Sequence, residues 1–184
     1  RSDLLSIMVR TPVRLTPPRD AKSTCHGRFG KLDNVVFGGV GGSGIVGDTL
    51  SDYCRPSTEI PVSVCRALTL PRFVGRRTLF IAISYSGETQ ETLLQLAQAA
   101  KHGARIIAVT SAAQLLSKAK APGLPFVKIP ASLPPRIALP ELVAATLYTL
   151  GVAGVIANVS NLLTQAARSI AVCLEKVGQS VPTQ

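Results

Sequence analysis

The sequence has no tryptophan and few aromatic residues, which make up 4% of its 184 residues, although 46% are hydrophobic. A core must therefore be built from aliphatic side chains, as is common where helices cover both faces of a parallel sheet. The length fits one domain of ordinary size.

Cysteine and histidine are also scarce, with four and two residues respectively, and no two cysteines form a Cys-x-x-Cys pair. Cys25 and His26 are adjacent but have no further ligands at metal-binding spacing. This pattern argues against a metal site and against a disulfide framework, and a reducing cytoplasm fits it best. We therefore expect a cytoplasmic protein without a bound metal.

Acidic residues number only 10 against 20 Lys and Arg, which gives a formal net charge of +10. Such a charge can serve a nucleic acid or an anionic small substrate, or it can simply keep the protein soluble. The basic residues are scattered, and their closest group is Arg72, Arg76 and Arg77. Because no basic run is interleaved with aromatics and no helix-turn-helix or zinc-finger spacing occurs, we predict no nucleic-acid partner.

Residues 142–167 contain no charged side chain and are numerous enough to span a bilayer. Glycines and polar residues interrupt them, so we predict a buried helix, a break near Gly151 or Gly154, and an amphipathic helix over about 156–176, with no membrane partner. The second helix is expected to pack into the domain's own core, with a second domain or a dimer interface as the alternative. Its apolar face is Val159, Leu162, Leu163, Ala166, Ile170 and Cys173.

A stretch rich in hydroxyl groups, residues 84–92, lies between a strand-like run at 78–83 and a helix-like run at 92–101. The turn between a strand and a helix presents free N–H groups and the positive end of the helix dipole, which suits an anion and phosphate above all. Ser84, Ser86 and Thr89 would add neutral hydrogen-bond donors. Ordinary helix capping is the alternative interpretation.

A glycine-rich turn, residues 38–44, is expected between a strand at 32–37 and a helix from about 45 to 54. Glycines there would let the backbone come close to a ligand. Gly39, Gly41 and Gly44 satisfy Gly-x-Gly-x-x-Gly, but Glu59 is the one acid near the spacing that a dinucleotide site requires, and it precedes the next strand. The turn also lacks the Gly-Lys-Ser/Thr of a Walker A loop.

Further strands are predicted at 60–64, 105–109 and 125–129, the last at an edge because prolines flank it. The alternation of strands and helices predicts an α/β fold, with a doubly wound, mainly parallel five-stranded sheet flanked by helices. Ligands bind at the carboxyl ends of strands in such sheets. Both turns described above, and Thr110-Ser111, fall at that edge, which predicts a phosphate or sugar-phosphate site.

Arg136 lies between prolines just before the helix that begins near residue 141. A rigidly placed arginine could make a bidentate contact to phosphate or carboxylate, and a surface arginine in a loop is the equal alternative.

Three motifs occur together and in order: Gly-Val-Gly-Gly-Ser-Gly at 39–44, Ser-Tyr-Ser-Gly-Glu-Thr-Gln-Glu-Thr at 84–92, and Pro-Arg-Ile-Ala-Leu-Pro at 135–140. The combination resembles the N-terminal SIS (sugar isomerase) domain, a flavodoxin-like fold, of bifunctional phosphoglucose/phosphomannose isomerases. That family's motifs read Gly-Met-Gly-Gly-Ser-Gly, Ser-Tyr-Ser-Gly-Asn-Thr-Glu-Glu-Thr and Pro-Arg-Ala-Ala-Leu-Pro. The resemblance covers about residues 33–150.

The resemblance implies an isomerase that interconverts glucose 6-phosphate or mannose 6-phosphate with fructose 6-phosphate, as a homodimer and without a metal or redox cofactor. It implies that Arg136 stabilises the enediol(ate) intermediate. The residues that it implies to bind the sugar phosphate are Gly42, Ser43, Ser84, Ser86 and Thr89.

The sequence departs from the family in two respects. The family's catalytic glutamate and ring-opening histidine lie in the second half of a chain nearly twice this length, and no residue here matches them. Glu88 replaces an asparagine beside the phosphate-binding hydroxyls, where a carboxylate repels phosphate unless it points away. It could instead serve as an acid at a helix N-terminus.

Three hypotheses remain open, and the first is preferred. The chain is the phosphate-binding N-terminal half of a sugar-phosphate isomerase, a non-catalytic sugar-phosphate-binding SIS module, or a small SIS isomerase in which Glu88, Glu91 or His102 faces a neighbour's site. We expect an irregular N-terminal segment at 1–30, a SIS domain at 31–152, and a C-terminal helix at 153–184 that would lead to a second SIS domain.

Overall fold

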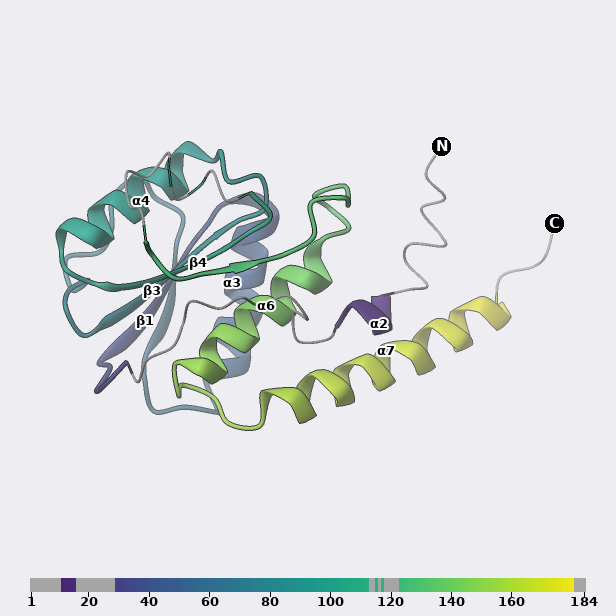
Figure 1. Ribbon diagram of the computed structural model, residues 1–184. Coiled ribbons are helices and arrows are strands. Elements are labelled where there is room, and N and C mark those ends of the chain that lie inside the picture. Colours follow the sequence, from purple (N-terminus) through teal and green to yellow (C-terminus); the bar gives the residue numbers. More distant parts are fainter. Residues whose placement is uncertain (1–10, 16–28, 113–114, 116, 118–122, 181–184) are drawn as a thin grey trace.

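The computed structural model describes residues 11–15, 29–112, 115, 117 and 123–180 (Figure 1). Its centre is a five-stranded sheet in the order β2-β1-β3-β4-β5, and all four pairings of neighbouring strands are parallel. The strands are β1 (Asn34–Gly38), β2 (Val62–Cys65), β3 (Thr78–Ser84), β4 (Arg105–Thr110) and β5 (Phe126–Lys128). The predicted α/β fold is thereby confirmed, with β5 at an edge as its prolines indicated.

Helices cover both faces of the sheet because the strands are apolar on both sides. Phe37 and Ile81 face a core shared with α3 (Gly41–Cys54) and α6 (Leu139–Val152). Their chain neighbours Val36 and Phe80 face a second core under α4 (Gln90–Lys101). Successive strand residues point to opposite faces, so this division follows from the strand period of two. Figure 1 shows α4 on one side of the sheet and α3 with α6 on the other.

The strand order reverses between β1 and β3. The chain leaves β1 through α3 to reach β2 on one side, then returns past β1 to β3 on the other. Helices α3 and α4, which follow β1 and β3, therefore begin at the carboxyl ends of adjacent strands, on opposite faces of the sheet. A reversal of this kind opens a crevice where ligands bind in doubly wound folds.

The apolar segment after residue 142 is divided into two helices, as predicted. Helix α6 ends at Val152, and α7 (Val159–Ser180) follows a connection in which Gly154 and Asn158 have positive φ angles of 73° and 56°. None of the helices that the structure describes combines the length and the apolar character needed to cross a membrane.

The C-terminal helix packs on the domain through its first half. Val159 and Leu163 are buried in the core that α3 and α6 share, whereas Cys173 is exposed, so the predicted packing of this face into the domain's own core holds for its first part and not at Cys173. Within the N-terminal segment, the short helix α2 (Thr11–Arg14) packs against both α6 and α7 (Figure 1). The other residues before Phe29 lie outside the described part of the chain.

Candidate functional site

The predicted site residues after β3 form a compact loop, residues 84–89, called here the serine loop. Ser84 ends β3 and is buried, with 1% of its surface exposed. Its hydroxyl oxygen accepts a hydrogen bond from the Gly87 N–H at 3.1 Å and lies 3.2 Å from the Thr89 hydroxyl. The exposed Ser86 hydroxyl accepts from the Glu88 N–H at 3.2 Å. The hydroxyl groups of Ser84 and Ser86 therefore stabilise the conformation of the serine loop through hydrogen bonds within it.

Gly87 allows the serine loop to turn tightly against the neighbouring strand. Its φ of 69° lies in the left-handed region, which residues with a side chain rarely adopt. A Cβ atom there would lie 3.0 Å from the Ala112 Cβ and 3.3 Å from the Thr110 hydroxyl. The loop is thus packed directly on the turn that follows β4.

Ser111 ties that turn to the serine loop. Its hydroxyl donates to the Tyr85 carbonyl oxygen at 2.6 Å, and its backbone N–H donates to the same oxygen at 3.2 Å. The sequence placed Thr110-Ser111 at this edge, and the structure brings Ser111 into direct contact with the serine loop. The sequence indicates this position of Ser111 because the residue follows directly on the apolar strand that ends near Val109.

Helix α4 begins immediately after the serine loop. Thr89 is its N-cap residue but makes no side-chain capping bond, and Glu91 lies in the first turn. The N–H groups of a first helical turn have no partner within the helix, and the helix dipole is positive at this end. The serine loop and these N–H groups together form the kind of cradle that binds a phosphate group.

The glycine-rich segment after β1 is a shorter turn than the predicted one at 38–44, because its residues from Gly41 onward belong to a helix. Helix α3 begins at Gly41, four residues before the predicted start, so Gly42 and Ser43 lie in its first turn. Gly39 makes the close approach that the turn needs, because a Cβ there would lie 2.9 Å from the Ile83 carbonyl oxygen. Gly42 is exposed and Ser43 is half-buried. The N-cap residue of α3 is Val40, which makes no side-chain capping hydrogen bond.

Arg136 lies in the connection between β5 and α6, and its side chain is exposed. The connection is fastened to the serine loop by Tyr85. The Tyr85 hydroxyl donates to the Leu133 carbonyl oxygen at 2.6 Å and accepts from the Leu133 N–H at 3.1 Å. The structure thus places the backbone of the Arg136 segment beside the serine loop, and the sequence reasoning missed Tyr85 although it lies inside the motif.

The thiols near the sheet are not nucleophiles or bases at neutral pH. Cys54 and Cys65 are buried free cysteines, and burial raises the pKa of Cys54 from 9.0 to about 11 and that of Cys65 above its usual value. Arg66, just after β2, is paired with Asp48 of α3, and this hydrogen bond raises the pKa of the guanidinium.

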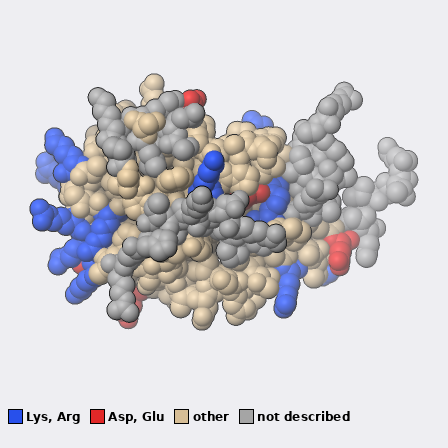
Figure 2. Space-filling view, in the orientation of Figure 1, with Lys and Arg blue, Asp and Glu red and all other residues tan. Residues whose placement is uncertain are grey.

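Much of the positive charge lies at the opposite, amino edge of the sheet. Arg76 and Arg77 precede β3, Arg105 begins β4, and Lys101 ends α4. Figure 2 shows Lys and Arg side chains gathered on the side of the molecule where, in Figure 1, the strands begin. This group lies across the sheet from the serine loop, so it cannot contact an anion held there.

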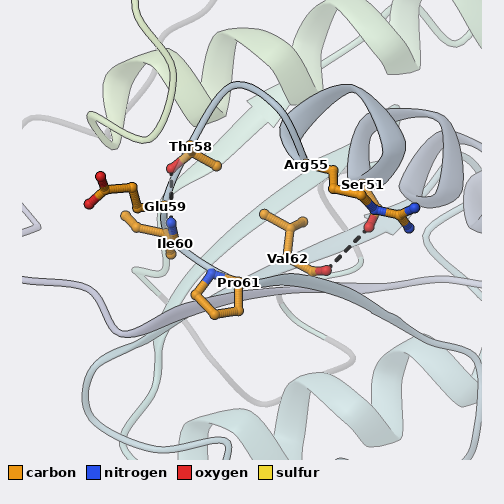
Figure 3. Close-up of a pocket in the computed structure, with 7 residues that line it drawn as sticks. All are labelled: Ser51, Arg55, Thr58, Glu59, Ile60, Pro61 and Val62. Carbon is orange, nitrogen blue, oxygen red and sulfur yellow. Dashed lines mark hydrogen bonds between the residues drawn. The ribbon is translucent and has the colours of Figure 1, made fainter.

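A hollow of about 230 Å³ lies at the amino edge as well, between the end of α3 and the start of β2 (Figure 3). Its wall includes Ser51, whose hydroxyl donates to the Val62 carbonyl oxygen at 3.2 Å, and Thr58, whose hydroxyl accepts from the Ile60 N–H at 3.1 Å. None of the predicted site residues lines it. The candidate site is therefore the open carboxyl edge and not this hollow.

Residues 30–120 match the SIS domain family. This segment is a SIS domain. The chain is 35% identical over 153 residues to the bifunctional phosphoglucose/phosphomannose isomerase of Caldicellulosiruptor bescii, covering 83% of this chain and 45% of that protein. It is 40% identical over 122 residues to the protein of the same name from Thermoplasma acidophilum, covering 66% and 37%.

The SIS domain also has the fold of solved phosphosugar isomerases. Tagatose-6-phosphate ketose/aldose isomerase from Escherichia coli superposes with a TM-score of 0.63 at 16% identity, over 94% of this chain and 51% of that one. At this identity the likeness concerns the fold alone. The chain spans less than half the length of the two isomerases with which it shares 35% and 40% identity.

Proposed function

We propose that this chain is the phosphate-binding part of a sugar-phosphate isomerase that interconverts glucose 6-phosphate or mannose 6-phosphate with fructose 6-phosphate. The serine loop carries the proposal, because it joins hydroxyl groups to the open N-terminus of α4 at the carboxyl edge of the sheet. The names of the relatives that are 35% and 40% identical supply the reaction.

The division of labour follows from the geometry of a sugar 6-phosphate. Ser84, Ser86 and Thr89, with the first N–H groups of α4, hold the phosphate. Gly42 and Ser43, in the first turn of α3, hold the sugar next to it. Arg136 serves the far end of the open-chain sugar, where its permanent positive charge stabilises the oxyanion that develops during isomerisation.

The reaction itself is a proton transfer between neighbouring carbons. A base removes the proton from C2 of the aldose, and the electron pair forms the C1–C2 double bond of an enediolate while the C1 carbonyl oxygen takes up negative charge. The proton of the C2 hydroxyl passes to the C1 oxygen, and protonation at C1 then leaves a carbonyl at C2 and a hydroxyl at C1, which is the ketose. The step needs neither an oxidant nor a reductant, because the substrate is internally oxidised and reduced.

We assign the catalytic base to the region of the related isomerases that this chain does not cover. Among the described carboxylates of this edge, Asp48 and Glu141 are each paired with an arginine. Glu88 and Glu91 flank the start of α4, at the phosphate end of the substrate rather than at C1 and C2. A cytoplasmic homodimer belongs to the same proposal, and light scattering during gel filtration tests it by giving twice the chain mass.

Calorimetry with fructose 6-phosphate and with unphosphorylated fructose tests the proposal, alongside a coupled assay for glucose 6-phosphate formation. We expect the phosphorylated sugar to bind and fructose to bind at least a hundredfold more weakly, since the charge-assisted hydrogen bonds to phosphate are lost. The expected turnover by these 184 residues alone is negligible. Equal binding of both sugars would refute the assignment of the serine loop, and rapid turnover would refute the assignment of the base.

A further inference from the structure

The segment that carries Arg136, residues 133–138 and called here the arginine loop, is stiff in itself. Pro134 and Pro135 have fixed φ angles, and the Pro134 carbonyl oxygen accepts from the N–H groups of Ile137 at 2.9 Å and Ala138 at 3.2 Å. The arginine loop is therefore a closed turn. The orientation of the arginine loop on the domain depends on the contacts made at its two ends.

Tyr85 of the serine loop holds the first end. Its hydroxyl uses its one proton on the Leu133 carbonyl oxygen and a lone pair on the Leu133 N–H, at 2.6 and 3.1 Å. Both polar backbone groups of one residue are thus satisfied by a single side chain 48 residues away in sequence. The backbone of Tyr85 is itself fixed by two hydrogen bonds from Ser111, so the anchor does not move independently of the phosphate cradle.

Arg14 of α2 holds the second end. Its guanidinium donates to both carboxylate oxygens of Glu141 in the first turn of α6, at 2.6 Å to Oε2, and also to the Ile137 carbonyl oxygen. The two side chains are 14% and 10% exposed, so the pair is nearly buried. A bidentate arginine–carboxylate pair has a defined geometry, which a solvated surface pair does not.

We propose that Tyr85 and Arg14 are positioning residues, which fix the arginine loop at both ends so that Arg136 is preorganised relative to the bound phosphate. The inference rests on the proposed function, in which Arg136 acts on the sugar whose phosphate the serine loop holds. It extends the functional unit to Arg14, which lies outside the residues that match the SIS domain family. Preorganisation matters because a small displacement of a charged group weakens its stabilisation of a developing charge.

Hydrogen–deuterium exchange on the ligand-free chain tests the anchoring directly. Tyr85→Phe removes only the hydroxyl, and Tyr53→Phe at the distal, exposed part of α3 is the matched control. The arginine loop has four exchangeable amides, those of Leu133, Arg136, Ile137 and Ala138. We expect about three- to tenfold faster exchange of these amides in Tyr85→Phe, the effect of one lost hydrogen-bonded pair, and wild-type rates in the control.

The second anchor is tested by removing both partners at once. Arg14→Met combined with Glu141→Gln avoids leaving one buried charge unpaired, which alone could unfold the domain. The matched control is Arg77→Met with Asp33→Asn, an exposed ion pair at the amino edge. Faster exchange of Ile137 and Ala138 is expected in the first double variant and not in the second. Unchanged exchange of the arginine loop in both Tyr85→Phe and the Arg14 double variant overturns the proposal, whether or not any ligand binds.

Binding then separates positioning from general structural damage. Tyr85→Phe should weaken the binding of fructose 6-phosphate about three- to tenfold and that of inorganic phosphate less than twofold, because the proposed function places Arg136 on the sugar and not on the phosphate. In an Arg136→Gln background the same substitution should have no further effect on fructose 6-phosphate, as expected when one residue acts through another. An equal loss in both backgrounds, or for both ligands, overturns the inference. A wild-type chain that binds neither ligand refutes the proposed function instead, and the exchange experiment still decides the anchoring.

Discussion

Gly87→Ala is expected to destabilise the protein by about 2–5 kcal/mol, because it strains the serine loop in two ways. A left-handed backbone costs a residue with a Cβ atom about 1–2 kcal/mol, and the φ of Gly87 is 69°. The new Cβ would also lie 3.0 Å from the Ala112 Cβ and 3.2 Å from the Ala112 carbonyl oxygen, so the turn after β4 has to shift. Overpacking of this kind costs about 1–3 kcal/mol.

Two other glycines provide controls for the two contributions. Gly41 has a φ of 57° but nothing within 4 Å of its Cβ position, and Gly42 has open space and no positive φ. Urea denaturation should therefore rank the losses Gly87→Ala above Gly41→Ala, with Gly42→Ala neutral or slightly stabilising because alanine favours the helix. Gly87→Ala should also weaken the binding of fructose 6-phosphate. This loss should exceed what the lower fraction of folded protein explains, because the substitution displaces the serine loop itself. If Gly87→Ala were as stable as Gly42→Ala, the described packing of the serine loop on the β4 turn would be wrong.

Two further substitutions probe charge. Glu88→Asn should raise the affinity for inorganic phosphate about two- to fivefold at low salt and less at 0.5 M, because a carboxylate beside the cradle repels the anion; unchanged affinity in calorimetry at low salt would show that Glu88 does not face the ligand. Burial raises the pKa of Cys54 from 9.0 to about 11, so the unfolded thiol ionises first and the stabilisation present below pH 9 is lost as the pH rises to 11. Between pH 8 and pH 10.5 the free energy of unfolding in urea should fall by about 1–2 kcal/mol less in Cys54→Ala than in the wild type. An equal fall in both proteins would contradict the assigned burial effect.

Patterns local in sequence predicted the fold well, because parallel strands buried on both faces are continuous apolar runs. The apolar run at residues 78–83 predicts a strand on that ground, and β3 is buried at every position. The sequence predicts the start of α3 four residues too late, because glycine has a low helix propensity and Gly41 and Gly42 are typical of a turn. Tertiary packing of the rest of the helix overrides that preference, as the burial of Val46 and Leu50 shows.

The residues that link separate parts of the site could not be found from sequence patterns. Tyr85 and Leu133 are joined by hydrogen bonds across 48 residues, and Arg14 reaches Glu141 across 127. Periodic patterns and short motifs report only on residues that are close in sequence. Contacts across such long separations depend on the tertiary arrangement of the loops and helices, so no local pattern predicts them. The partner of Glu141 thus lies in the N-terminal segment, which the sequence predicts to be irregular.

Binding of fructose 6-phosphate to Ser84→Ala/Thr89→Ala, measured by calorimetry against the wild-type chain, tests the central claim most directly. Each hydroxyl that bonds the charged phosphate contributes about 1.5–3 kcal/mol, so the double variant should bind at least a hundredfold more weakly. Thermal unfolding of the same sample shows whether the domain is still folded. Wild-type affinity in a folded double variant would mean that the serine loop does not hold the phosphate, and the proposed site would have to be abandoned.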